Sequence, residues 1–167
     1  MSSVTGKTNI ALVVITAAVT ASVIFIGYRA ERYASSTGFC LKCHSMSYPY
    51  EGLKKSVHYG RVGMDPQCRD CHFPPGFAGK VKTHIFEGLK DTVSSFRLDL
   101  STPDAFARHK DEFAEKARGA IRATRSASCR ACHKNPRPAS VYGQESHKKL
   151  ATGEATCVDC HQGIFHD

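Results

Sequence analysis

The stretch that decides the fold is Cys40-Leu41-Lys42-Cys43-His44, and the same Cys-x-x-Cys-His pattern recurs three more times along the 167 residues. Together the four copies contain all eight cysteines of the chain. Two thiols three residues apart reach the two vinyl groups of one heme, and the histidine that follows meets the iron. The pattern predicts four covalently attached hemes, with Cys40, Cys43, Cys68, Cys71, Cys129, Cys132, Cys157 and Cys160 as attachment sites and His44, His72, His133 and His161 as motif histidines.

Structural zinc is the alternative explanation for such clusters, because cysteine and histidine are also zinc ligands. Zinc would require pairs of Cys-x-x-Cys to converge on one tetrahedral site, and it gives no reason for a histidine after every pair. Because no cysteine lies outside the four motifs, we expect no structural disulfide.

The spacing of residues reveals a duplication. His58 lies 18 residues after Cys40 and ten before Cys68, and His147 lies 18 after Cys129 and ten before Cys157. The chain is therefore interpreted as a diheme unit repeated with an offset of 89 residues. This repeat makes His58 and His147 the first candidates for the second axial ligand of an iron.

Low-spin electron-transfer hemes need two strong axial ligands, so the histidines outside the motifs can be counted against four positions. His166 is favoured as a further distal ligand, and His109, which lies among charges, is interpreted as a surface residue. The halves differ at Met46, whose equivalent in the second half is Asn135. A thioether is a weaker iron ligand that raises the potential, and the residues alone leave open whether His44 or Met46 binds the first iron.

The segment near the N-terminus, NIALVVITAAVTASVIFIGY over residues 9–28, is a run of 20 residues without a charge. As a helix it would be about 30 Å long, enough to cross a bilayer. A cleaved signal peptide would have a shorter apolar region, of about 7–15 residues. We therefore expect a retained anchor over residues 1–29 and a heme domain over residues 30–167. Covalent heme attachment outside the bacterial cytoplasmic membrane predicts a cytoplasmic N-terminus and a periplasmic heme domain.

The formal net charge of +8 invites a nucleic-acid interpretation. Four hemes would add eight propionates, which would bring the part of the chain after the apolar segment to about −1 before the iron charge is counted. We therefore expect no nucleic-acid partner, and we expect many basic side chains to neutralise propionates.

The predicted fold is mainly α with much irregular structure, a multiheme c-type cytochrome built on a duplicated diheme unit with one transmembrane helix. Diheme units are expected at about 38–76 and 127–167, joined by helices between 80 and 125. The first of these helices, from 80 to about 96, has an apolar stripe formed by Val81, Ile85, Leu89, Val93 and Phe96. Basic residues around the stripe indicate a helix that lies either at the membrane surface or against hemes.

His84, Glu87 and Asp91 follow i, i+3 and i+7 spacing, so an α-helix would place them on one face. An imidazole and carboxylates there are able to accept protons from a reduced substrate, although a solvated polar face is the commoner outcome. Further on, Ser101-Thr102-Pro103 predicts the start of a second helix.

One anchor, four motifs and Cys-x-x-Cys-His-x-Met at the first of them resemble the membrane-anchored tetraheme quinol dehydrogenases of the NapC/NirT family. The resemblance extends to Cys68-Arg-Asp-Cys-His-Phe-Pro, to Lys90-Asp91 and to the closing Thr156-Cys-Val-Asp-Cys-His-Gln-Gly-Ile-Phe-His166. It covers essentially the whole chain.

This resemblance implies roles residue by residue. Met46 rather than His44 would bind the first iron, and Asp91 would stand on the open side of that heme beside a quinol pocket. His166 would complete the second heme, His58 one heme of the second half, and His147 the last heme, as in the nitrate-reductase type. The chain departs from the family where His84 replaces a lysine and Pro75 replaces a histidine.

The implied function is that of a quinol dehydrogenase or electron-transfer subunit. It would oxidise menaquinol or ubiquinol and pass electrons to a periplasmic nitrate or nitrite reductase or to another multiheme cytochrome. A membrane-tethered electron wire without a quinol site is the competing hypothesis, and catalysis at an open heme is a third. Asp91 and His84 are the candidate proton acceptors.

Overall fold

The computed structural model describes residues 2–61, 63, 65–163 and 166, with side chains described from residue 9 onward. Ile164 and Phe165 of the closing motif, and the side chain of Lys7, lie outside the described residues. Helices form 71% of the chain, and the described residues contain no strand, which confirms the mainly α prediction.

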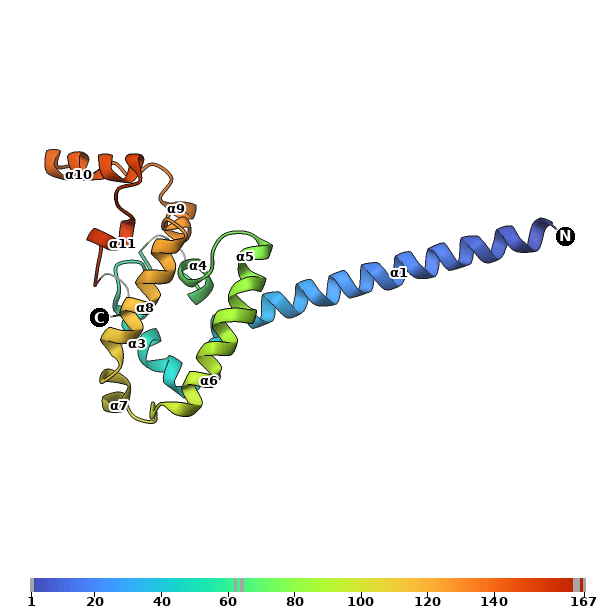
Figure 1. Cartoon of the computed structure of the whole chain (residues 1–167), viewed down its shortest axis with the longest axis horizontal. Helices are drawn as coiled ribbons and strands as arrows, with labels where there is room; N and C mark the ends of the chain where they lie inside the picture. The colour runs from blue at the N-terminus through green and yellow to red at the C-terminus, as the bar shows by residue number, and fades with distance from the viewer. Residues whose placement is uncertain (1, 62, 64, 164–165, 167) are drawn as a thin grey trace. The chain divides into compact units, whose positions relative to one another are not determined.

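Figure 1 shows the helices in chain order. Their bounds are α1 Ser2–Ala34, α2 Thr37–Cys40, η1 His44–Met46, α3 Ser47–Lys55, α4 Cys68–His72, α5 Phe77–Lys82, η2 Thr83–Gly88, α6 Leu89–Arg97, α7 Pro103–Ala107, α8 Lys110–Ala123, α9 Ala127–Cys132, α10 Val141–Thr152 and α11 Cys157–Cys160.

The chain divides into two compact units, one up to Ser35 and one from Ser36 onward. The first unit is α1, in which an 18-residue apolar window within Asn9–Ala34 has a mean hydropathy of 2.6 and no buried side chains. A helix of 26 residues is about 39 Å long. By length and composition this segment can cross a membrane, and its exposure distinguishes it from a core helix of a globular domain.

The second unit consists of short helices joined by turns and has very little apolar core of its own. Among the described residues, the buried apolar side chains are Leu53, Leu100, Ala105 and Val158. A cofactor-free domain of this size would bury far more apolar surface. The scarcity fits a protein in which heme macrocycles supply most of the core.

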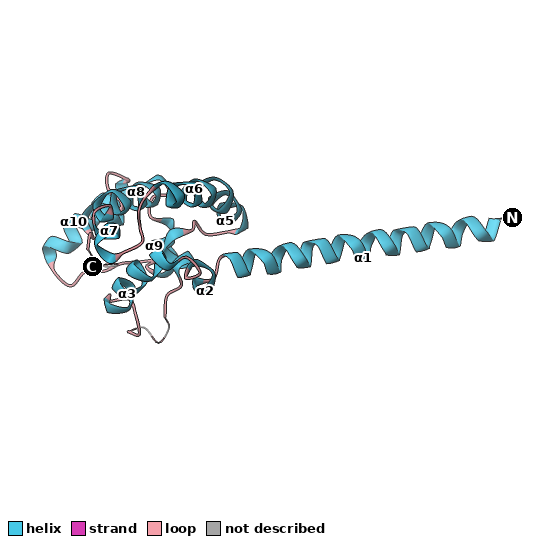
Figure 2. Ribbon diagram, turned by 90° about the horizontal axis from the view of Figure 1, so that it is seen from below, coloured by secondary structure: helices cyan, strands magenta, loops and turns pink. Residues whose placement is uncertain are grey.

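Helices α5, η2 and α6 form one continuous rod that lies beside α8 (Figures 1 and 2). The predicted helix from 80 to about 96 is present inside this rod, but its middle, Thr83–Gly88, is π-helical. Two threonine hydroxyls flank the turn, since Thr83 donates to the Gly79 carbonyl and Thr92 to the Gly88 carbonyl. Such side-chain bonds to the preceding turn distort helices.

The π-helical turn corrects the prediction that His84, Glu87 and Asp91 share one face. That prediction assumed α-helical geometry throughout, whereas one wide turn rotates everything after it by about 100° relative to the residues before it. His84 and Asp91 accordingly contact different partners.

The second predicted helix begins as expected, because the Thr102 hydroxyl accepts a hydrogen bond from the Ala105 N–H at 3.1 Å and Pro103 occupies the first position. The helix is interrupted at Arg108 and His109, and α8 starts at Lys110. At this break the His109 ring stacks on the Phe113 ring, with ring centroids 5.7 Å apart.

Candidate heme sites

The four Cys-x-x-Cys-His motifs fold locally in two ways. In the second, third and fourth motifs both cysteines lie within one short helix, which places their side chains on one face, one turn apart. In the first motif the helix α2 ends at Cys40, and Cys43 follows in a turn that leads directly into η1. The first motif therefore has a different exit geometry from the other three.

The duplication predicted from residue spacing is also present in the hydrogen bonds. The backbone N–H of Cys68 donates to the buried Thr37 hydroxyl at 3.1 Å, and that of Cys157 donates to the buried Ser126 hydroxyl, also at 3.1 Å. Each hydroxyl lies three residues before the first cysteine of its own unit. The spacing of cysteines and histidines alone did not single out these hydroxyls, but extending the 89-residue offset to them would have done so.

A second repeated contact starts the helix of the later motif in each unit. Asp70 Oδ2 accepts the backbone N–H of Gln67 at 2.8 Å, and Asp159 Oδ2 accepts that of Thr156 at 2.6 Å. These are capping boxes, which fix the first turn of a helix by satisfying its free N–H groups. In both units the carboxylate belongs to the Cys-x-Asp-Cys-His sequence itself.

The attachment cysteines follow one another in space in the same order as in the chain. The Cys40 and Cys68 side chains lie close together, and so do those of Cys129 and Cys157. Between the units α4 packs against α9. Burial, and after it the neighbouring Cys129, raises the pKa of the Cys71 thiol to about 11. The four motifs are thus arranged as a continuous series from first to last.

Three of the motif histidines each face a second imidazole. Ring centroids are 6.0 Å apart for His72 and His166, 6.1 Å for His133 and His58, and 6.2 Å for His161 and His147. Two imidazoles on opposite sides of one metal ion, each with a nitrogen about 2 Å from it, have centroids about 6 Å apart. The three separations therefore fit an iron ion between each pair of rings.

The environment of the distal rings also fits metal binding. His166 Nδ1 donates to the Pro49 carbonyl at 2.7 Å, the bond by which a metal-bound histidine usually fixes its ring. This bond leaves Nε2 as the free nitrogen. His147 Nδ1 is buried and has no hydrogen-bond partner in the described part of the chain, and an unpaired buried nitrogen is costly unless an ion or ligand completes it.

His44 is held differently from the other motif histidines. Its Nε2 lies 3.0 Å from the carbonyl oxygen of Leu100, a hydrogen bond for which Nε2 carries the proton. A protonated nitrogen cannot bind iron. Met46, two residues further on, is 37% exposed and lies at the end of η1. The protein itself therefore occupies the Nε2 of His44, whereas the Met46 side chain stays exposed beside the same motif.

The two candidate proton acceptors have separate surroundings. His84 packs edge-on against Phe73, with ring centroids 4.7 Å apart. Asp91 forms an ion pair with Lys116 of α8 and interacts electrostatically with His72. Sequence reasoning missed Lys116, because it lies on another helix and no spacing rule connects it to Asp91.

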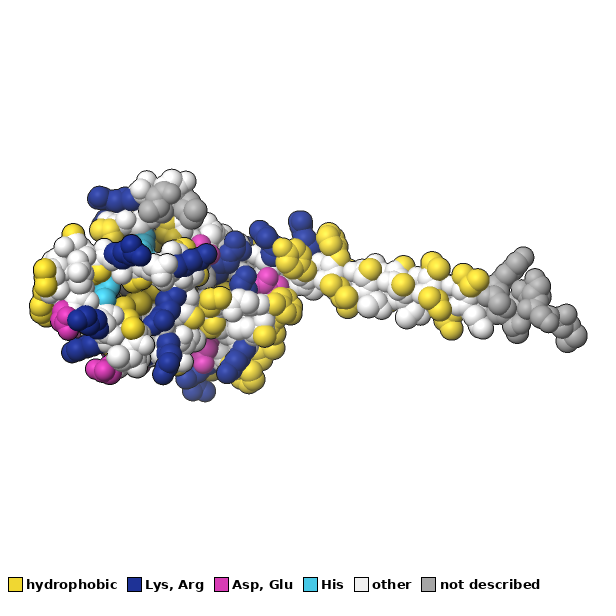
Figure 3. Space-filling model, turned by 90° about the horizontal axis from the view of Figure 1, so that it is seen from above, with side chains coloured by type: hydrophobic (Ala, Val, Ile, Leu, Met, Phe, Trp, Pro, Cys, Tyr) yellow, Lys and Arg dark blue, Asp and Glu magenta, His cyan; other side chains and the backbone are white. Residues whose placement is uncertain are grey.

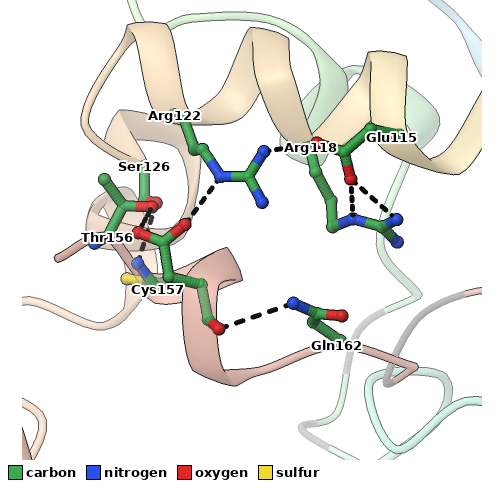
Figure 4. A network of polar contacts seen from close by, with 8 residues as sticks. Glu115, Arg118, Arg122, Ser126, Thr156, Cys157 and Gln162 are labelled. Atoms are coloured by element: carbon green, nitrogen blue, oxygen red, sulfur yellow. Dashed lines mark hydrogen bonds and ion pairs between the residues drawn. The ribbon is translucent and has the colours of Figure 1, made fainter.

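The last motif is tied to α8 by a charged network (Figure 4). Arg122 donates to Asp159 Oδ1 and to Glu115 Oε1, each at 2.6 Å. Together with the Thr156 N–H and hydroxyl, Arg122 lowers the pKa of Asp159 to about 2. Asp159 therefore stays ionised and holds α11 against α8.

A structural zinc site requires four convergent ligands. Over the part of the chain that the structure describes, no group of three or more His, Cys, Asp or Glu side chains is arranged to hold one ion. The cysteine–histidine clusters instead lie as separate motifs, each beside a distal ring or a methionine.

Comparison with known proteins places these features in a family context. The model of the NapC/NirT cytochrome c family, N-terminal region, matches residues 3–167. A probable tetraheme cytochrome c-type protein of Nitrosomonas europaea is 40% identical over 86% of this chain and 63% of its own length. The NapC protein of Haemophilus influenzae is 32% identical over 96% of this chain and 82% of its own length.

Two further relatives extend the comparison. TorC of Escherichia coli K12 is 33% identical over 94% of this chain but only 42% of its own length, so the chain spans less than half of that relative. A crystal structure of the cytochrome c nitrite reductase NrfHA complex bound to the HQNO inhibitor aligns with a TM-score of 0.53 at 21% identity, over 92% of this chain and 88% of that one. This likeness shows the fold.

Proposed function

Because the chain belongs to the NapC/NirT cytochrome c family, we propose that it oxidises quinol at the outer face of the bacterial cytoplasmic membrane. Electrons would pass singly through four covalently bound hemes to a periplasmic redox enzyme such as a nitrate or nitrite reductase. The substrate would be menaquinol or ubiquinol. The N-terminus would be cytoplasmic and the heme domain periplasmic.

The observation that carries this proposal is that the four motif histidines do not have the same kind of partner. Three of them face a second imidazole at 6.0–6.2 Å, which supports bis-histidine ligation by the pairs His72–His166, His133–His58 and His161–His147. His44 instead bonds to a backbone carbonyl, which supports Met46 as the ligand of the first heme. A methionine-bound heme has a higher potential than a bis-histidine heme, so the first site differs in kind from the others.

The order of the attachment sites supports a single electron path. Cys40 contacts Cys68, α4 packs against α9, and Cys129 contacts Cys157. Electrons that enter at the first heme would therefore leave from one of the hemes of the second unit. When bound, the hemes supply the electron chemistry, and the chain supplies their spacing, ligands and electrostatic surroundings.

Quinol oxidation also releases two protons, and the chain offers acceptors on the rod. In the proposal an Asp91 carboxylate oxygen takes a proton from the quinol hydroxyl, while the Lys116 ammonium holds that carboxylate in place from α8. His84 is a second acceptor on the same rod. A carboxylate and an imidazole are common groups for this task because their pKa values can be tuned toward neutrality.

Partners are proposed by analogy with the relatives. NapC of Haemophilus influenzae and TorC of Escherichia coli are named cytochrome c-type proteins, and the structural neighbour is a complex of a nitrite reductase. A periplasmic reductase or another multiheme cytochrome is therefore the expected electron acceptor. The competing function, an electron wire without a quinol site, would need a protein donor instead.

The test uses the full-length protein with all four hemes in nanodiscs. Reduced menaquinol and ubiquinol analogues are mixed with it, and heme absorbance is followed by stopped flow, with and without HQNO, the inhibitor in the neighbouring structure. We expect direct reduction, slowed at least about 100-fold by Asp91→Asn, because a positioned proton acceptor typically contributes about 10²–10⁴-fold.

The control variant is Asp111→Asn, which removes an exposed carboxylate of α8 that lies outside the proposed site. Heme content, measured by the pyridine hemochrome method, should be four per chain in all variants. Failure of both quinols to reduce the wild-type protein would favour the electron wire. Unchanged rates for Asp91→Asn would remove that residue from the proposal.

A further inference from the structure

The rod formed by α5, η2 and α6 exposes a ridge of large apolar side chains. Phe96 is 87% exposed, Leu89 65% and Phe77 63%, and Ile85 and Phe86 are exposed to a similar degree. Figure 3 shows hydrophobic side chains gathered on this part of the surface, with lysines and arginines beside them. A contiguous apolar ridge of this kind marks an interaction site rather than ordinary surface. We call Phe77, Ile85, Phe86, Leu89 and Phe96 the apolar ridge.

The rod contacts the rest of the heme domain through residues other than those of the apolar ridge. His84 packs on Phe73, and Asp91 pairs with Lys116 of α8. The five side chains of the ridge are each more than half exposed. The ridge is therefore available to a partner outside the domain.

Basic residues border the apolar ridge and determine the kind of partner. Lys80, Lys82, Lys90 and Arg97 lie on the rod, and within the described part of the chain none of them is in an ion pair. An apolar face bordered by unpaired cations is the composition of helices that lie in the surface of anionic membranes. Another protein or a second copy of this chain would require a matching acidic surface instead.

The chain itself tethers the heme domain that carries this rod to a bilayer. The membrane-spanning segment ends at Ala34, and the first helix of the heme domain begins at Thr37. A connection this short gives the domain a high effective concentration at the bilayer surface, so even a weak membrane contact would be occupied most of the time.

We propose that the segment Phe77–Arg97 lies in the surface of an anionic phospholipid bilayer, with the apolar ridge inserted among the acyl chains and the four basic residues at the headgroups. Each basic residue near an anionic surface strengthens binding about fivefold. This contact sets the orientation of the heme domain on the membrane, which the anchor alone does not. It does not depend on quinol oxidation.

The test measures the depth of the ridge in the full-length protein with four hemes, one copy per nanodisc, in bilayers rich in phosphatidylglycerol. A nitroxide label is placed at Leu89→Cys or Phe96→Cys, and the matched control is Tyr142→Cys on α10, whose native side chain is 84% exposed. The label reacts only with the new thiol because the eight native cysteines carry heme. Spin-resonance saturation then compares access of oxygen with access of a water-soluble nickel chelate.

We expect the oxygen-to-nickel ratio at positions 89 and 96 to exceed that at position 142 at least fivefold, and to fall in phosphatidylcholine or when Lys80, Lys82 and Lys90 are replaced by Gln. Equal ratios at all three positions would overturn the proposal, since the ridge would then be in water. Low access of both reagents would overturn it too, because hemes or protein would cover the ridge.

A second measurement avoids the label altogether. Hydrogen exchange of the wild-type protein is compared between nanodiscs of the two lipids, and we expect backbone amides over 85–97 to exchange at least tenfold more slowly with phosphatidylglycerol. Identical exchange in both lipids would contradict the role of the basic residues. Because neither readout involves quinol, a failure here would leave the proposed function standing, and the reverse also holds.

Discussion

The two diheme units have the same spacing but use their middle histidines differently. His147 lies inside helix α10 and faces His161 of its own unit, whereas His58 lies in a turn beyond α3 and faces His133 of the other unit. His72 of the first unit in turn faces His166, from the end of the second. The units therefore exchange imidazoles, and a repeated spacing does not by itself fix which rings come together.

The physical reason for this difference is local. In the second unit α10 continues to Thr152 and ends on Gly153, whose φ of +78° suits a helix C-terminus. In the first unit α3 already ends at Lys55, so the chain carrying His58 is free to reach across. A helix that continues keeps its histidine in its own unit, and a helix that stops early releases it.

Removal of the imidazole at His147 should have the largest effect on this comparison. His147→Ala leaves the heme of the last motif with one axial ligand, so one of the bis-histidine hemes should become high-spin while four hemes stay attached. Electron paramagnetic resonance measures the change, with His109→Ala as the control. If the resonance signals of all four hemes stay unchanged, His147 binds no iron.

Conversion of the first site toward the other three should have the next largest effect. Met46→His would replace the thioether ligand of the first heme with an imidazole, which is a stronger ligand. The reduction potential of that heme should fall by on the order of 0.1 V. Spectroscopic redox titration checks this shift. A potential that does not move would indicate that Met46 is not an iron ligand and that the first site resembles the rest.

Removal of either duplicated hydroxyl, that of Thr37 or that of Ser126, should lower the free energy of unfolding moderately and by the same amount. Thr37→Val and Ser126→Ala each leave the N–H of a heme-attaching cysteine without its buried acceptor, which should cost about 1–2 kcal/mol of unfolding free energy. Thermal unfolding followed by heme absorbance should show a lower midpoint for both. Thr37→Ser keeps the acceptor and should stay close to wild type, and a large difference between the two units would contradict their equivalence.

Removal of the charged contacts should give the smallest effects, and these effects should differ between the two diheme units. Arg122 bonds Asp159 at 2.6 Å and also Glu115, whereas Arg69 is 3.8 Å from Asp70 in the first unit. Since these side chains are exposed to solvent and salt, both losses should be small, and Arg122→Ala should lower the unfolding midpoint more than Arg69→Ala does. Unfolding measured at low and high salt checks this order. Equal losses would show that the tie to α8 adds nothing.

The sequence predicted much of this molecule because its strongest signals are local. Cys-x-x-Cys-His motifs need only five consecutive residues, an anchor needs only a long apolar run, and both belong to the family that the comparison confirms. The mainly α fold was also predicted correctly. The π-helical turn was missed, because no period in the sequence marks one wide turn in a helix. The prediction that His84 and Asp91 share a face was therefore wrong.

What the sequence determined by itself is the number of heme attachment sites, the duplication and the membrane-spanning segment. The motifs and the apolar run each consist of consecutive residues, and the duplication follows from comparing the spacing of residues in the two halves. Only the tertiary structure decided which imidazoles face one another, that His44 turns to Leu100, and that Lys116 meets Asp91. Those partners lie on segments far apart in sequence, brought together by the packing of helices around a core with few apolar side chains of its own. No spacing rule reaches across such distances.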